Sequence, residues 1–197
     1  MSSRRTMALA ALLAPLAFLS ACGHSPQTQF LTLDPSPGAP SAAASYLGAP
    51  VRIPSIEIPP ALDRVEFTRQ TGPGEMKVDD LVHWSAPLGM LARNTLILDL
   101  AQRLPSGAVS PPDAAAQPGG RRASVSILSF GITGTEATMV ASYAFSPEDG
   151  PPGTPHWTHL SATSAGDNPQ QTAHAFSTLL GLLADRMAAD MMAMPGR

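Results

Sequence analysis

The chain has one cysteine, Cys22, and this residue follows an apolar amino-terminal segment. Because a disulfide needs two thiols, none can form within the chain, and apolar packing has to hold the fold together. With 197 residues, of which 44% are hydrophobic, the chain is long enough for one packed core and short for two full-sized domains. We therefore expect one domain that folds without covalent cross-links.

Residues 1–21 have the composition of an export signal. Arg4 and Arg5 precede an uncharged apolar run from Met7 to Leu19, which ends in small residues. A spanning helix needs ~20 apolar residues, and this shorter run is interrupted by Pro15, so a permanent transmembrane anchor is the weaker interpretation. An ordinary cleavable signal before a soluble protein is the other alternative.

The tetrapeptide Leu19-Ser20-Ala21-Cys22 resembles the lipobox of bacterial lipoproteins. In those proteins the cysteine sulfur receives a diacylglyceryl group, the signal is cut just before the cysteine, and the new amino group is acylated, typically with palmitate. Small side chains fit the protease cleft, and a thiolate is nucleophilic enough to accept the lipid. The resemblance implies a lipid on Cys22, and Gly23 after the cysteine implies sorting to the outer membrane, on its periplasmic face.

After the signal we expect a lipid anchor and tether over residues 22–50, followed by the folded domain over residues 51–194. Within the tether, residues 30–33 form a candidate first strand, whereas residues 34–50 are rich in Pro, Ala, Ser and Gly and are predicted to be irregular. The polar residues between Cys22 and the candidate strand are few, so the domain should lie close to the lipid surface.

Strands are predicted in two groups. Val51 to Ile58 alternates apolar residues, with Pro54 forcing a bulge or an edge position. Val65 to Gln70 and Glu75 to Val78 form a predicted hairpin around a Gly-Pro-Gly turn. The second group comprises Ser124 to Phe130, Glu136 to Phe145 and His156 to Ser164.

A helix is predicted after each group of strands. The first runs from Pro87 to Leu104, and its apolar side is predicted to hold Met90, Leu96, Ile97, Leu98, Leu100, Ala101 and Leu104. Its polar side holds Thr95, Asp99, Gln102 and Arg103. Arg93 falls within the apolar arc, so it is expected to extend its guanidinium to solvent or, as the alternative, to pair with a carboxylate.

The second helix is predicted from about Pro169 to Met192, capped by Asp167 or Asn168, with an apolar stripe of Phe176, Leu180, Leu183, Met187 and Met191. The predicted fold class is therefore α+β: a single domain with a mainly antiparallel sheet and two amphipathic helices packed on one face.

No catalytic, cofactor or metal site is predicted. His156 and His159 are three residues apart on a strand, so they point to opposite faces and cannot close on one ion. Asp79 and Asp80 with His83 could supply an acid and a base, but carboxylates beside a hairpin are more often solvated. The formal net charge is −3 and Lys77 is the only lysine, which argues against a nucleic-acid partner.

Four short motifs, in their order along the chain, resemble the PqiC (YmbA-like) family of auxiliary lipoproteins of ABC-type transport and MCE systems. They are Phe30 to Asp34, Ile56 to Pro59, Leu62-Asp63-Arg64, and Trp84-Ser85-Ala86-Pro87-Leu88 opening a helix. This resemblance spans most of the chain after Cys22.

The resemblance implies an outer-membrane lipoprotein that is not an enzyme. It is expected to form a homo-oligomer and to dock onto a periplasm-spanning, PqiB-like MCE-domain protein. In this role it would help to move phospholipid between membranes and so support envelope integrity. Asp63, Arg64 and Trp84 are the motif positions to test as a partner interface. Their structural alternative is a turn-stabilising ion pair and a packing indole. The competing function is an unrelated periplasmic lipoprotein that binds a ligand or inhibits an enzyme.

Overall fold

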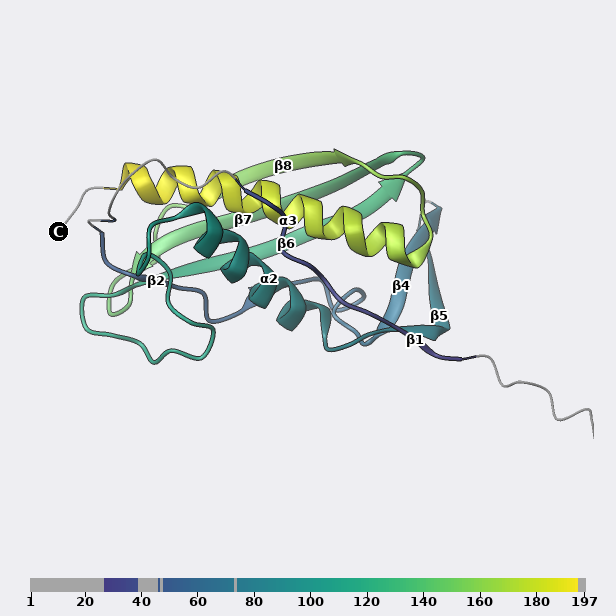
Figure 1. Cartoon of the computed structure of the whole chain (residues 1–197), viewed down its shortest axis with the longest axis horizontal. Coiled ribbons are helices and arrows are strands. Elements are labelled where there is room, and N and C mark those ends of the chain that lie inside the picture. The colour runs from purple at the N-terminus through teal and green to yellow at the C-terminus, as the bar shows by residue number, and fades with distance from the viewer. Residues whose placement is uncertain (1–26, 39–45, 47, 73, 195–197) are drawn as a thin grey trace, which may run out of the picture.

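A computed structural model describes residues 27–38, 46, 48–72 and 74–194, and Figure 1 shows their arrangement. The predicted export signal and Cys22 lie outside these residues. Within the described part of the chain, no helix combines the length and the apolar character needed to cross a membrane.

The larger sheet has three long antiparallel strands, β6 (Arg121–Thr133), β7 (Glu136–Pro147) and β8 (His156–Thr163). Two short strands, β2 (Val51–Arg52) and β3 (Ile56–Glu57), both pair with β6 in parallel. Pro54 lies between β2 and β3 at the edge of the larger sheet, which agrees with the predicted edge position, because proline cannot donate a ladder hydrogen bond.

The smaller sheet has the order β1-β5-β4. The predicted hairpin is confirmed as β4 (Glu66–Gly72) and β5 (Glu75–Trp84), and Gly74 in its turn has a φ of 73°, which favours glycine. The expected first strand is β1 (Gln29–Leu31), which pairs with β5 in parallel. Figure 1 shows these three strands together at one end of the molecule.

Helices α2 (Leu88–Arg103) and α3 (Pro169–Ala193) pack against each other on one face of the larger sheet (Figure 1). Asn168 caps α3, since its side-chain oxygen accepts a hydrogen bond from the backbone N–H of Gln171. The α+β fold class is confirmed, with one difference: both sheets are mixed, because short parallel strands line their edges.

The apolar stripe of α3 forms the centre of the core, as predicted. Its five members are fully buried: Phe176, Leu180, Leu183, Met187 and Met191. The ring of Phe176 stacks on Phe130 of β6 with centroids 4.4 Å apart, which joins the helix to the sheet.

The prediction for the buried side of α2 is wrong in part. Met90 and Leu98 are 49% and 51% exposed, whereas Asp99 and Arg103 from the predicted polar side are 0% and 4% exposed. The reason is that Asp185 on α3 and Ser36 in the amino-terminal segment bond to Arg103 and Asp99, so the polar side can pack inward. Arg93 donates to the carbonyl of Pro54 at 3.0 Å, and its Nη2 lies 3.7 Å from Oδ1 of the exposed Asp113, so the carboxylate alternative holds.

Candidate functional site

The segment that follows β1 is fastened to both helices. Leu31 and Leu33 are buried, and the Oγ1 of Thr95 on α2 donates to the carbonyl of Leu33 at 3.4 Å. On the α3 side, the backbone N–H of Asp34 donates to the Oγ of Ser177 at 3.1 Å. The part of the predicted tether that the structure describes therefore packs on the domain.

Ser36 makes the densest contacts of this segment. Its backbone N–H donates to Oδ1 of Asp99 at 2.7 Å, and its hydroxyl donates to the carbonyl of Ser177 at 3.0 Å. Its own carbonyl accepts a hydrogen bond from Nη1 of Arg103 at 3.2 Å. One residue thus links the amino-terminal segment to α2 and α3.

Arg103 lies between two carboxylates. Its Nε donates to Oδ1 of Asp185 on α3 at 2.5 Å, and its Nη1 lies 3.5 Å from Oδ1 of Asp99, one turn earlier on α2. Arg103 and Asp99 are buried, while Asp185 is half exposed. We call Ser36, Asp99, Arg103, Ser177 and Asp185 the clasp.

Burial raises the pKa of Asp99 to about 6, against the opposing effects of the Ser36 hydrogen bond and the Arg103 charge. Its second oxygen, Oδ2, is buried and has no hydrogen-bond partner among the described residues. The carboxyl is therefore an acid whose proton is retained in the folded state to higher pH than in the unfolded chain.

Gly181 permits the close approach of the segment to α3. A Cβ added there would lie 2.6 Å from the Cβ of Ser36, which is closer than real Cβ contacts. Glycine at this helical position costs up to about 1 kcal/mol relative to alanine in helix propensity, and here it makes room for the clasp.

Asp63 acts as a remote cap for α2. Pro87 at the start of this helix provides no side-chain hydrogen bond, and Oδ1 of Asp63 instead accepts from the backbone N–H of Gly89 at 2.8 Å. A carboxylate at a helix amino terminus also interacts favourably with the helix dipole. Asp63 is exposed but is held in place by this bond.

The other two motif residues lie apart from this cap. Arg64 is exposed and its Nε donates to Oε2 of Glu66 at 3.2 Å, so its ion-pair partner is Glu66 and not Asp63. Trp84 is 4% exposed and packs against Phe67 with ring centroids 5.7 Å apart. Its indole contributes to the core beneath the smaller sheet, and only Asp63 and Arg64 are at the surface.

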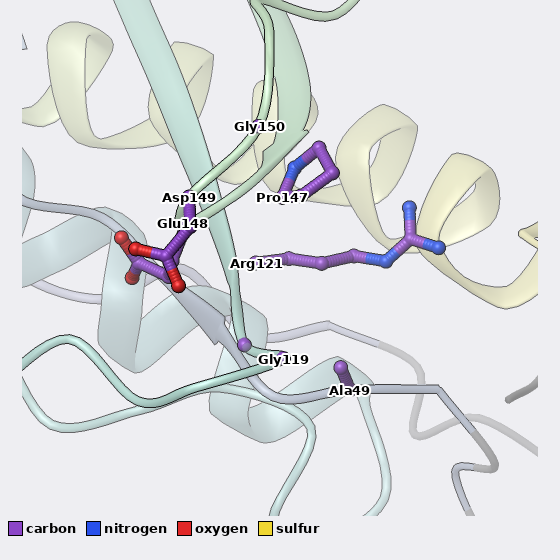
Figure 2. Close-up of a pocket in the computed structure, with 8 residues that line it drawn as sticks. Ala49, Gly119, Arg121, Pro147, Glu148, Asp149 and Gly150 are labelled. Carbon is purple, nitrogen blue, oxygen red and sulfur yellow. The ribbon is translucent and has the colours of Figure 1, made fainter.

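A hollow of about 300 Å³ lies at one end of the larger sheet, between residues 119–121 and 147–150. Figure 2 shows that the Arg121 side chain points away from the carboxylates of Glu148 and Asp149. Glu148 pairs with Arg52 through two hydrogen bonds of 2.7 and 2.8 Å, which hold the pKa of Glu148 below its usual range. The polar groups of this hollow therefore do not converge on one point.

A second hollow of about 300 Å³ lies between β8 and the end of α3. The hydroxyl of Tyr143 donates to Oδ2 of Asp190 at 2.7 Å, and Nδ1 of His156 lies 3.2 Å from the same oxygen. Burial raises the pKa of Tyr143, and the hydrogen bond to Asp190 raises it further. In the described ranges, His, Asp and Glu side chains form no group that could hold a metal ion.

Sequence reasoning did not predict the clasp. The one available signal was the Asp99-Arg103 spacing of four residues, which places an acid and a base on the same side of a helix. Ser36 carried no signal, because it lies in a segment without periodicity and its partners are more than 60 residues away.

These features define an α+β domain whose amino-terminal segment is fastened across two helices. Residues 31–188 match the family model described as ABC-type transport auxiliary lipoprotein component. The chain therefore belongs to this PqiC (YmbA-like) family of transport auxiliary lipoproteins.

Two solved structures share the fold. One, of an uncharacterized protein, has a TM-score of 0.68 at 14% identity and covers 84% of this chain and 99% of its own. The other, protein XCC0632 from Xanthomonas campestris, has a TM-score of 0.62 at 13% identity, with 85% and 93% covered. The comparison with curated proteins found no match.

Proposed function

We propose that this chain is the outer-membrane lipoprotein of an MCE/ABC-type intermembrane lipid transport system, anchored through acyl chains on Cys22. The observation that carries the proposal is the family match over residues 31–188, together with the lipobox-like tetrapeptide that ends at Cys22. In this role the protein docks onto a periplasm-spanning MCE-domain partner, assembles as a homo-oligomer and supports envelope integrity without catalysing a reaction.

The clasp supports an anchored role. A docking protein has to transmit its attachment from the lipid to the folded body, and the clasp joins the segment after the anchor to both helices within a few residues of β1. Asp63 and Arg64 remain the proposed partner contacts, and Arg64 is the better test, because its side chain is exposed and pairs with Glu66, whereas Asp63 also caps α2. Trp84 would act by holding the smaller sheet beneath them.

The experiment is affinity purification of the tagged, acylated protein from detergent-solubilised envelopes after cross-linking, with proteins identified by mass spectrometry. We expect recovery of an MCE-domain protein with the wild type and reduced recovery with Arg64→Glu, while Lys77→Glu serves as a matched charge-reversal control. Repeated absence of an MCE-domain protein, with the lipoprotein correctly localised and the partner expressed, would favour a ligand-binding or enzyme-inhibiting lipoprotein.

A further inference from the structure

The outer face of the smaller sheet carries four exposed apolar side chains, which lie beside the paired polar residues Glu66, Thr68 and His83. Phe30 on β1 is 66% exposed, and on β5 Met76, Val78 and Leu81 are 42%, 39% and 41% exposed. The opposite face packs into the core through Leu31, Phe67, Val82 and Trp84. We call Phe30, Met76, Val78 and Leu81 the apolar face.

The register explains why these four side chains share one face. Phe67 is buried and pairs with Asp79, so the alternate residues Met76 and Val78 point outward. A register shift follows between Glu66 and Phe67, after which Val82 and Trp84 point inward, leaving Leu81 outward. Phe30 pairs with His83, and their rings meet edge to face at 5.9 Å on the same outer side.

The position of this face relative to the proposed anchor indicates what covers it. Phe30 is eight residues after Cys22 in the sequence. A fully extended chain of that length spans at most about 29 Å, so a lipid on Cys22 keeps the bilayer surface within that distance of Phe30. Phe30 is therefore the member of the apolar face nearest to the anchor along the chain, and the pairing of β1 with β5 brings the β5 members to the same sheet.

The orientation of this face is fixed by contacts with the rest of the domain. Nη1 of Arg69 on β4 donates to Oδ2 of Asp167 at 2.9 Å and to the carbonyl of Asp167 at 3.1 Å, just before α3. Leu31, next to Phe30, is buried in the core. Seating this sheet on a surface would consequently orient the whole domain.

We propose that the apolar face seats on the phospholipid bilayer that holds the anchor. The proposal rests on the proposed function, because the acyl chains on Cys22 hold the bilayer within reach of a face that binds it only weakly without them. Glu75, Asp79 and Asp80 on β5 outnumber Lys77, so burial of apolar side chains and not attraction to anionic headgroups provides the contact. The contact is accordingly insensitive to salt and does not require anionic lipid.

The test uses the acylated full chain in vesicles of phosphatidylethanolamine and phosphatidylcholine. A photo-crosslinking amino acid replaces Phe30 or Leu81 on the apolar face, and Leu98 or Trp157 as controls, since these are 51% and 64% exposed elsewhere. We expect phospholipid adducts, identified by mass, at the first two positions and not at the controls. Equal adducts at all four positions, none at Phe30 and Leu81, or cross-links there to a second copy or another protein, would overturn the proposal.

A second measurement uses the unacylated Cys22→Ser chain and its flotation with the same vesicles. Phe30→Gln combined with Leu81→Gln should lower the partition coefficient roughly tenfold or more, whereas Leu98→Gln should leave it unchanged. Fatty-acid labelling of the acylated chain distinguishes the two failures. If the chain incorporated no fatty acid, both the proposed anchor at Cys22 and the proposed bilayer contact would be wrong. If it incorporated fatty acid but formed no phospholipid adducts at Phe30 and Leu81, only the proposed bilayer contact would be wrong.

Discussion

Nε of Arg103 on α2 donates a hydrogen bond to Oδ1 of Asp185 on α3, and the same guanidinium lies 3.5 Å from the buried Asp99. Replacing Arg103 by Met would leave Asp99 without its counter-charge. Since removing one partner of a buried ion pair leaves an uncompensated charge, we expect a loss of about 3–5 kcal/mol in the free energy of unfolding at pH 7.5.

Urea denaturation of the mature chain measures this loss, with the exposed Arg64→Met as the matched control. The control should change stability by no more than about 0.5 kcal/mol. Equal midpoints for both variants would mean that the clasp contributes nothing to stability.

The buried carboxyl of Asp99 predicts a specific pH dependence. Its pKa is raised from 3.8 to about 6 in the folded state, so the native state binds the proton more tightly than the unfolded chain. The free energy of unfolding should therefore fall as pH rises from about 4 to above 6, by up to roughly 3 kcal/mol at ~1.4 kcal/mol per pKa unit.

Asp99→Asn removes this titration, so the wild type should gain stability relative to the variant as pH falls from 7.5 to 5. Denaturation midpoints and slopes at several pH values measure the difference. An identical pH profile for the two proteins would contradict the burial of an ionisable carboxyl in the clasp.

Leu180 tests the core stripe of α3. The side chain is fully buried, so Leu180→Ala should destabilise the domain by about 2–5 kcal/mol through lost transfer energy and a cavity. Leu98→Ala, at a position 51% exposed on α2, should cost much less. An unchanged midpoint and slope for Leu180→Ala would exclude this residue from the core.

Substitutions at Asp63 and Arg64 distinguish a role in helix capping from a role in partner binding. Asp63→Ala should cost about 0.5–2 kcal/mol of stability, because the Gly89 N–H loses its acceptor, and Asp63→Asn should retain most of it. Arg64→Ala should leave stability nearly unchanged. If Asp63→Ala were as stable as Arg64→Ala by thermal denaturation, the capping role would be wrong.

Cys22 is the predicted lipid site. Cys22→Ala should abolish incorporation of labelled palmitate and release the protein from the membrane fraction, because no other thiol can accept the diacylglyceryl group. Immunoblotting of the fractions controls for expression. Equal labelling of the variant and the wild type would contradict the assignment.

The elements of the fold were predictable because each carries a local signal. The hairpin was indicated by its Gly-Pro-Gly turn, and α3 by its apolar stripe with Asn168 and Pro169 at its start. The parallel pairing of β1 with β5 was not predicted, since a three-residue strand has no period and its partner is about 50 residues away.

The buried side of α2 shows why the site was harder to predict. Hydropathy placed Leu98 inside and Asp99 outside, whereas the structure has the reverse. A buried ion pair depends on partners from distant segments, here Ser36 and Asp185. The sequence of the helix itself does not indicate that these partners are present. Asp63 was singled out by its motif, but its hydrogen bond to Gly89 follows from the folded geometry.

The attachment of β1 determines how a pull from the membrane would enter the domain. Tension on the chain before Gln29 would act along β1. Because β1 pairs with β5 in parallel, such a force would load the hydrogen bonds between the two strands together and not one after another. Behind it, Ser36 is held to both helices, so any load that passes the strand is divided between α2 and α3. A load applied at the amino terminus would therefore be shared among β5, α2 and α3.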